Sequence, residues 1–377
     1  MQTNINGTRF KKIYFRKKST DEYVLYKKAY IDGVQTYSAG NPVTYVVDSG
    51  VSYTEEVEYG ASCLSPKTFT PAKSGWTFVG WREDKTANAS VFTTKVMGDN
   101  PITLYAVFKA TVTQTFISYS GKSQTASGTR YYNNGNVVNA TIKAPTGTAY
   151  SGWTWRGWSA AGVTTANAAV SYANGGSIAN QTGAATYYGL YQKTITLTTV
   201  ANGKSTANTG TAYFNGSGTT LNPTFTVANP TKSGATFKGW STSASSTTVS
   251  NSTISGLSLS ANTTRYAVFK YADGTLTERW PAGRQTIVSQ IDDILTETVN
   301  GAQIATISLT MQIDDNVEPN SYICIGTTQL AQMLAGTRTY TLTIPANASG
   351  KICTSYYAFA YWHGGVKATY VGRTVVG

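Results

Sequence analysis

A glycine–aromatic motif occurs three times in this 377-residue chain and constrains its fold more than any other feature. It reads Gly-Trp-Thr-Phe-Val-Gly-Trp at 75–81, Gly-Trp-Thr-Trp-Arg-Gly-Trp at 152–158 and Gly-Ala-Thr-Phe-Lys-Gly-Trp at 234–240, and its second glycines lie 77 and 82 residues apart. An aromatic closing segment follows each motif: LYAVFK at 104–109, YYGLYQK at 187–193 and RYAVFK at 265–270. Repetition at this period predicts three similar small modules in tandem.

The motif itself has the composition of a β-strand that supplies a small core. Strict alternation would place Trp76 and Phe78 on one face of the strand and Trp81 on the other. The glycines permit a bulge or a close approach of another backbone. The large aromatic residues of the three motifs are the expected core of the repeats: Trp76, Phe78, Trp81, Trp153, Trp155, Trp158, Phe237 and Trp240.

The rest of the chain also favours short strands and turns. The hairpin-like segments 121–136 and 203–218 align with an offset of 82 residues. Alternating segments in 271–377, separated by turn clusters, indicate a β-sandwich or jelly-roll. One short helix is expected within it at 327–336, where Leu330, Met333 and Leu334 share a helical face. The predicted fold class is therefore mainly β.

Five segments follow from these patterns: a basic hairpin segment at 1–42, repeats at 43–110, 111–193 and 194–270, and a terminal β-sandwich at 271–377. Residues 9–38 read as two hairpin-like halves, each with a Lys-Lys pair before an aromatic strand. Because almost no linker separates one repeat from the next, we expect a semi-rigid rod, which is the design of a spacer.

Charge is unevenly distributed along the chain, whose net charge is +12. Residues 111–270 contain ten Lys or Arg and no Asp or Glu, so this span offers no carboxylate for general acid–base chemistry or a hard-cation site. Its charge either attracts anionic polymers or simply keeps a Ser/Thr-rich surface soluble. A dense basic stripe is lacking, so no specific nucleic-acid recognition is predicted.

Catalytic and metal-binding patterns are weak throughout. The three cysteines, Cys63, Cys324 and Cys353, are expected to be buried thiols, with a Cys324–Cys353 disulfide as the alternative. A single histidine argues against a zinc site or a catalytic triad. The Gly-Lys-Ser segments at 121–123 and 203–205 lack the upstream glycine of a phosphate-binding loop. The acidic turns at 292–293 and 314–316 lack calcium-loop spacing. We therefore predict no enzyme, no cofactor and no metal.

Two groups of residues are candidate contacts with partners. One is an aromatic cluster near the carboxyl end, interpreted either as a glycan or protein contact or as ordinary core: Tyr356, Tyr357, Tyr361, Trp362 and His363. The other is a set of anchor residues near the amino end, interpreted either as contacts with a larger assembly or as a solvated basic face: Lys11, Lys12, Tyr14, Lys27, Lys28 and Tyr30. No apolar run reaches the ~18 residues of a membrane span, so no membrane insertion is expected.

The motif and its closing segments resemble the internalin B-type, or Listeria–Bacteroides, repeat. This resemblance covers 43–270 and implies β-grasp-like modules of the kind found in tandem on extracellular and phage-associated proteins. The second repeat departs from it with YYGLYQK, and the third has Ala235 in place of the first aromatic residue. The Lys-Lys segments near the amino end are similar to short repeats of phage tail and appendage proteins.

Together these resemblances imply a non-enzymatic protein of a tailed-phage virion, a fibre, appendage or decoration, exposed on the particle and attaching to the host surface. Its implied partners are other virion proteins and a host glycan or protein. The amino terminus lacks a secretory h-region, which agrees with assembly in the host cytoplasm. The alternatives are a bacterial surface adhesin and a carbohydrate-active enzyme with its site in 271–377. The sequence decides neither which end is anchored nor the oligomeric state.

Overall fold

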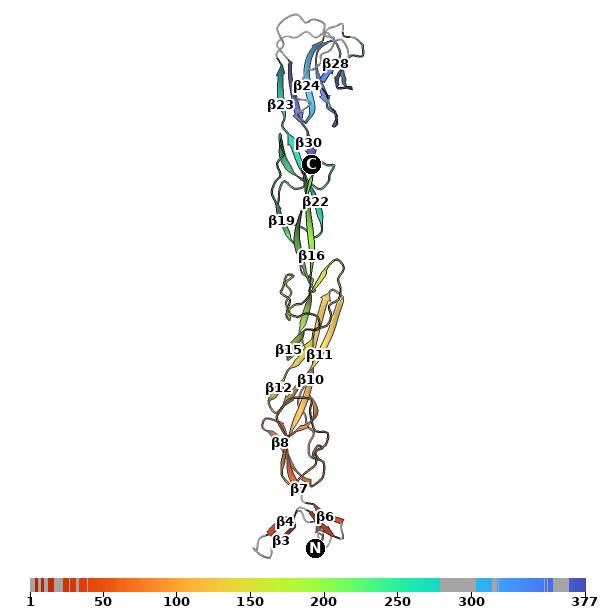
Figure 1. Cartoon of the computed structure of the whole chain (residues 1–377). Helices are drawn as coiled ribbons and strands as arrows, with labels where there is room; N and C mark the ends of the chain where they lie inside the picture. Colours follow the sequence, from red (N-terminus) through yellow and green to blue (C-terminus); the bar gives the residue numbers. More distant parts are fainter. Residues whose placement is uncertain are drawn as a thin grey trace. The chain divides into compact units, whose positions relative to one another are not determined.

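The structure is a computed structural model, and it describes residues 4–5, 8–9, 13–16, 23–26, 28–31, 34–38, 40–278, 303–313, 317, 319–348, 350, 352–354 and 366–377. All regular secondary structure in these residues is β-strand, which confirms the mainly β prediction (Figure 1). None of them forms a helix long and apolar enough to cross a membrane. The chain divides into two compact units, one of residues 1–193 with 213–221 and one of 194–212 with 222–377.

The amino-terminal segment contains three short antiparallel strand pairs. Strand β1 (Asn4–Ile5) pairs with β2 (Thr8–Arg9). Strand β3 (Ile13–Arg16) pairs with β4 (Tyr23–Tyr26), and β5 (Lys28–Ile31) pairs with β6 (Val34–Ser38). The last two pairs correspond to the two hairpin-like halves that the sequence predicts.

The first repeat is built on four strands: β7 (Gly40–Asp48), β8 (Val51–Glu58), β9 (Thr77–Arg82) and the first half of β10 (Ile102–Tyr119). Their order in the sheet is β8-β7-β10-β9. Strands β7 and β10 run parallel at the centre, and the outer strands pair antiparallel with them. A parallel central pair made of the first and last strands is the arrangement that the term β-grasp-like describes.

The second repeat uses the same plan. The second half of β10 forms a hairpin with β11 (Lys122–Asn133) and runs parallel to β16 (Thr186–Ala201), which pairs with the motif strand β14 (Thr154–Trp158). Strand β12 (Asn136–Val138) pairs antiparallel with the end of β11. A two-stranded sheet of β13 (Ala140–Lys143) and β15 (Ser177–Gln181) contributes Ile142 and Ile178 to the repeat's buried apolar clusters.

The third repeat repeats the plan once more. Its strands are the second half of β16, β17 (Lys204–Asn215), the motif strand β20 (Ala235–Ser241) and the closing strand β22 (Thr263–Tyr271). Strand β18 (Thr220–Leu221) pairs with β17, and β19 (Thr224–Val227) pairs with β21 (Ile254–Ser258). The closing strand of one repeat thus continues as the opening strand of the next, in β10 across residue 110 and in β16 across residue 193.

Each motif strand contains a bulge, so the strict alternation expected from the sequence is wrong. In the first repeat Gly80 pairs with Val107 and Phe78 with Phe108, which leaves Val79 as the extra residue. The bulge brings Phe78 and Trp81 into one core, with ring centroids 5.2 Å apart. Gly157 has a φ of 146°, and a Cβ there would lie 2.4 Å from Val170 Cγ1, so glycine is required.

The terminal domain is a sandwich of two sheets. One has the order β23 (Gly274–Glu278), β29 (Val366–Gly372), β24 (Ile304–Ile313), β27 (Gly336–Thr343), and the other has β26 (Thr328–Gln332), β25 (Tyr322–Ile325), β28 (Ile352–Thr354). Residues of both sheets, among them Leu309 and Ile323, share one buried core. A last strand, β30 (Thr374–Val376), pairs with β22 of the third repeat.

The expected helix at 327–336 is wrong, because this segment contains strand β26, which pairs antiparallel with β25. The proposed helical face is divided in the structure: Met333 is 2% exposed, whereas Leu334 is 45% exposed. Next to it, Cys324 of β25 lies opposite Cys353 of β28. Both of these residues and Cys63 are thiols in the structure.

Candidate functional site: the junctions between repeats

The predicted core aromatics occupy two environments in the repeats. Trp81, Trp158 and Trp240, the last residues of the three motifs, are at most 1% exposed. The indole Nε1 of Trp81 donates to Leu64 O at 3.1 Å, and that of Trp158 donates to Pro145 O at 2.8 Å. The other five predicted core residues are only partly buried: Trp76, Phe78, Trp153, Trp155 and Phe237. Two of these, Trp76 and Trp153, face the following repeat.

The first junction centres on Tyr132 at the end of β11, which belongs to repeat 2 but packs against repeat 1. Its ring centroid lies 5.8 Å from that of Trp76, and Lys73 Nζ lies 3.8 Å from the ring centroid of Tyr132. Lys73 also pairs with Asp48 at 2.6 Å, and the Tyr132 hydroxyl donates to the Asp48 carboxylate. The hydrogen bond from Lys73 lowers the pKa of Asp48. Tyr132 therefore joins the two repeats through its ring, which contacts Trp76 and Lys73, and through its hydroxyl, which donates to Asp48 of the ion pair.

The next residue, Asn133, acts as a polar latch between the two repeats. Its side chain is completely buried. Its Nδ2 donates to two backbone carbonyls of repeat 1, Asp84 O at 3.0 Å and Thr86 O at 3.1 Å. Asn136 Nδ2 adds a third such bond, to Lys85 O at 2.8 Å. Because carbonyls are fixed in direction by their backbone, these bonds define one orientation of the loop against β11.

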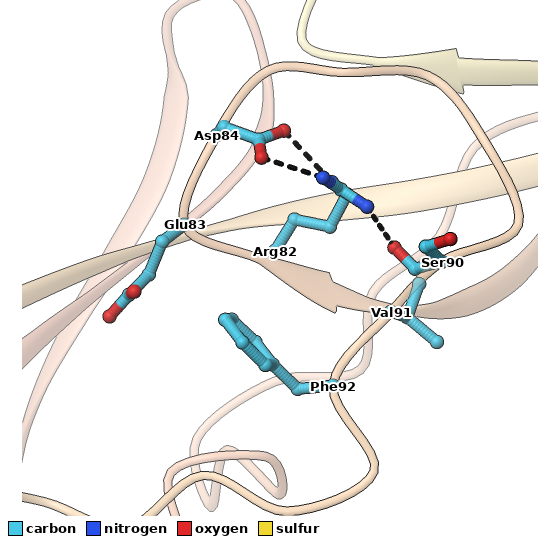
Figure 2. Close-up of a pocket in the computed structure, with 6 residues that line it drawn as sticks. All are labelled: Arg82, Glu83, Asp84, Ser90, Val91 and Phe92. Atoms are coloured by element: carbon cyan, nitrogen blue, oxygen red, sulfur yellow. Dashed lines mark hydrogen bonds and ion pairs between the residues drawn. The ribbon is translucent and has the colours of Figure 1, made fainter.

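Arg82 holds the loop that carries these carbonyls, beside an open cavity of about 370 Å³ (Figure 2). Its Nε and Nη2 donate to the two carboxylate oxygens of Asp84 at 2.8 and 2.6 Å, and its Nη1 donates to Ser90 O and to Asn88 Oδ1. This bidentate pair lowers the pKa of Asp84 well below its usual range. All three guanidinium nitrogens donate hydrogen bonds within the loop, so Arg82 stabilises the wall of the cavity. Its six lining residues are Arg82, Glu83, Asp84, Ser90, Val91 and Phe92.

The second junction has the same latch. Asn215, at the end of β17, is completely buried, and its Nδ2 donates to Val163 O and Thr165 O, each at 3.1 Å. Its Oδ1 accepts a bond from Ser217 N at 2.9 Å. Asn133 and Asn215 lie 82 residues apart, which is the offset of the aligned hairpins.

Aromatic residues replace the ion pair of the first junction. Phe214 contacts Trp153 and Tyr150, with ring centroids 5.7 and 5.2 Å away. Tyr150 in turn stacks on Tyr119 at 4.6 Å. In the alignment of the repeats, Tyr150 and Tyr119 occupy the positions of Lys73 and Asp48 in the first repeat. The second junction is therefore apolar where the first is charged.

The remaining candidate contacts belong to the two ends of the chain. Tyr14 is in β3, and Lys28 and Tyr30 are in β5. Lys11, Lys12 and Lys27 lie outside the described residues, as does the whole carboxyl-terminal cluster: Tyr356, Tyr357, Tyr361, Trp362 and His363. The acidic turns at 292–293 and 314–316 also lie outside them. Among the described residues, no three His, Cys, Asp or Glu side chains gather as a metal site.

Sequence reasoning did not single out the latch residues. The signal was present in the hairpin alignment, where Tyr-Tyr-Asn at 131–133 matches Tyr-Phe-Asn at 213–215. Those residues were interpreted only as parts of a hairpin, because periodicity shows which residues recur and not which module they contact. Their contacts with the preceding repeat become visible only in the structure.

Fold and junctions together define a tandem-repeat β protein whose modules share strands. Two segments, residues 42–107 and 194–268, match the family model of the Listeria-Bacteroides repeat domain. These matches correspond to the first and third repeats and support the resemblance drawn from the motif. No curated protein and no solved structure matches the chain.

Proposed function

We propose that this chain is a non-enzymatic structural protein of a phage virion, a fibre, appendage or decoration, whose repeats act as a spacer and which takes part in attachment to the host surface. One observation carries the spacer role: consecutive repeats share a strand and are latched by a buried asparagine. A continuous strand leaves no linker that could bend freely. Such a junction suits a protein that must hold two functional ends at a set separation.

The virion context is supported by the resemblance of the amino-terminal segment to short repeats of phage appendage proteins, and by the repeat type, which is found on surface proteins. In this proposal the basic amino-terminal segment binds other virion proteins. The aromatic cluster of the terminal domain contacts a host glycan or protein, since aromatic rings stack well on apolar sugar faces. The protein is then exposed on the particle surface.

Two variants of the full chain test this assignment. The first replaces Lys11, Lys12, Lys27 and Lys28 with Glu, and the second replaces Tyr356, Tyr361 and Trp362 with Ala. We expect the first variant to lose binding to particles that lack the protein while keeping binding to host cells, and the second to do the opposite. A control with Lys204 and Lys238, both exposed in the third repeat, replaced by Glu should bind both.

The pattern of binding separates the alternatives. If the unmodified chain labels cells but never particles, the surface adhesin is the better description. If the two variants show the reverse pattern, the terminal domain is the virion-bound end and the amino-terminal segment faces the host. Binding to neither would contradict the virion proposal.

A further inference from the structure

The last strand of the chain returns to the repeat that precedes the terminal sandwich. In β30, Thr374 lies opposite Lys270, Val375 opposite Phe269 and Val376 opposite Val268 of β22. The backbone N–H of Gly377 continues the ladder by donating to Ala267 O at 3.1 Å. The sandwich is thus joined to the third repeat twice, where the chain leaves β22 and where it comes back as β30.

The same position in the first repeat is filled by the end of β11. There Tyr131 lies opposite Lys109, Tyr132 opposite Phe108 and Asn133 opposite Val107. The receiving residues are the same in both cases, Val-Phe-Lys at 107–109 and at 268–270. Strand β30 therefore occupies, on the third repeat, the position that the following repeat's docking strand occupies on the first.

The side chains at the two positions can be compared residue by residue, and the two large rings of the first junction are absent from the third repeat. Tyr132 packs against Trp76 beneath Lys73. In the third repeat Ala235 stands at the position of Trp76, and Val375 stands at that of Tyr132. Lys232, at the position of Lys73, lies 5.5 Å from the ring centroid of Phe269. Both members of the ring pair are replaced by small residues, while the strand pairing is kept.

Hydrogen bonds made by Asp273 and Arg373 hold the residues that lead into β30. Asp273 Oδ1 accepts a bond from Gly372 N at 2.8 Å, and the same carboxylate pairs with Lys270. The guanidinium of Arg373 donates to Ile304 O at 2.8 Å and to Ile344 O at 2.9 Å, both in the sandwich. These bonds hold the residue before β30 against the sandwich, so β30 is connected to that domain by side-chain hydrogen bonds as well as by the chain.

We propose that Ala267–Lys270 is a strand-binding site of the kind that joins the repeats, and that Thr374–Gly377 is its ligand. The site takes an extended segment that offers backbone donors and acceptors along one edge and a β-branched or aromatic residue opposite Phe269. The terminal sandwich is then fixed to the array as a further repeat would be. This inference goes beyond the proposed function and does not depend on it.

Binding in trans tests the site directly. A chain that ends at Arg373 is titrated with the peptide of residues 371–377 and followed by NMR. We expect saturable shifts at Ala267–Lys270, the same shifts with the peptide of residues 129–135, and none with a scrambled peptide. The full chain should show no shifts, because its site is filled. Absence of shifts in the folded truncated chain at millimolar peptide would overturn the proposal.

A double-mutant cycle in the full chain keeps the test independent of the truncation. Ala235→Trp and Val375→Tyr each place one large ring at the site, and together they recreate the ring pair of the first junction. We expect the pair to be coupled favourably, by roughly 2- to 10-fold in the equilibrium constant for local opening of β30 from β22, as aromatic pairs are. Amide hydrogen exchange at Ala267–Lys270 in the four chains measures this coupling. Independent or mutually unfavourable effects would show that β30 does not occupy an equivalent site.

Discussion

Replacing the buried latch of the first junction, Asn133→Ala, tests whether the repeats are held together as described. The substitution removes two hydrogen bonds, to Asp84 O and Thr86 O, from a side chain with no exposed surface. Each such bond contributes about 1 kcal/mol net, and the two carbonyls lose their partner, so the junction should be destabilised by about 2–3 kcal/mol. That corresponds to a roughly 30- to 150-fold rise in the population of the open junction.

Amide hydrogen exchange measures this opening locally, which matters because a multi-domain chain does not unfold in one step. Exchange should accelerate by that factor in the peptides that cover Tyr131–Asn133 and the loop 82–92. Asn136→Ala is the matched control: Asn136 is exposed and makes one bond to the same loop, so its loss should change exchange by no more than about threefold. Equal, small effects of both substitutions would refute the latch.

Three further predictions concern the two junctions, the bulges and the thiols. The pKa of Asp48 is lowered in the fold, so its stabilisation is complete above pH about 5 and is lost as the pH falls through the lowered pKa. After correction for the intrinsic pH dependence of amide exchange, the protection factors should fall with acid at the first junction but not at the acid-free second, and parallel behaviour would contradict this. Gly239→Ala should destabilise the third repeat by about 2–5 kcal/mol in denaturant titrations, because the alanine Cβ would lie 2.5 Å from a methyl of Val249 and the backbone φ is 141°. The control Gly203→Ala, which has open space around it, should cost about 1 kcal/mol. Equal costs would argue against the bulge. Oxidised glutathione should form a disulfide between Cys324 and Cys353, because facing residues on antiparallel strands have Cα atoms about 4.5–5.5 Å apart, within disulfide range. Mass spectrometry of a non-reduced digest detects the linked peptides, and their absence would contradict the pairing.

Much of the fold follows from short-range patterns in the sequence. The triplicated motif and the alternating segments predict a mainly β chain of tandem repeats, as observed. The bulge before Gly80 did not follow, because alternation assumes one residue per pleat, and only the contact between Phe78 and Trp81 reveals the extra residue. The helix predicted at 327–336 failed because pairing with β25 outweighs a weak helical pattern.

Long-range pairing is the part that sequence reasoning could not supply. Asn133 and Asn215 are polar residues beside turn glycines, and such residues are usually exposed. Their burial depends on carbonyls of the preceding repeat, about fifty residues away. Likewise, nothing in Thr374–Val376 indicates pairing with β22, because three β-branched residues fit any open sheet edge.

The distance between the first two repeats tests the central claim, that the shared strand β10 and the buried Asn133 hold these two repeats in one fixed orientation. Spin labels on unnatural amino acids at the exposed positions Glu56 and Thr141 avoid the native cysteines and report the separation as a distribution. We predict a single narrow distribution, which broadens in Asn133→Ala. A broad distribution in the unmodified chain, like that of a flexible linker, would contradict the account.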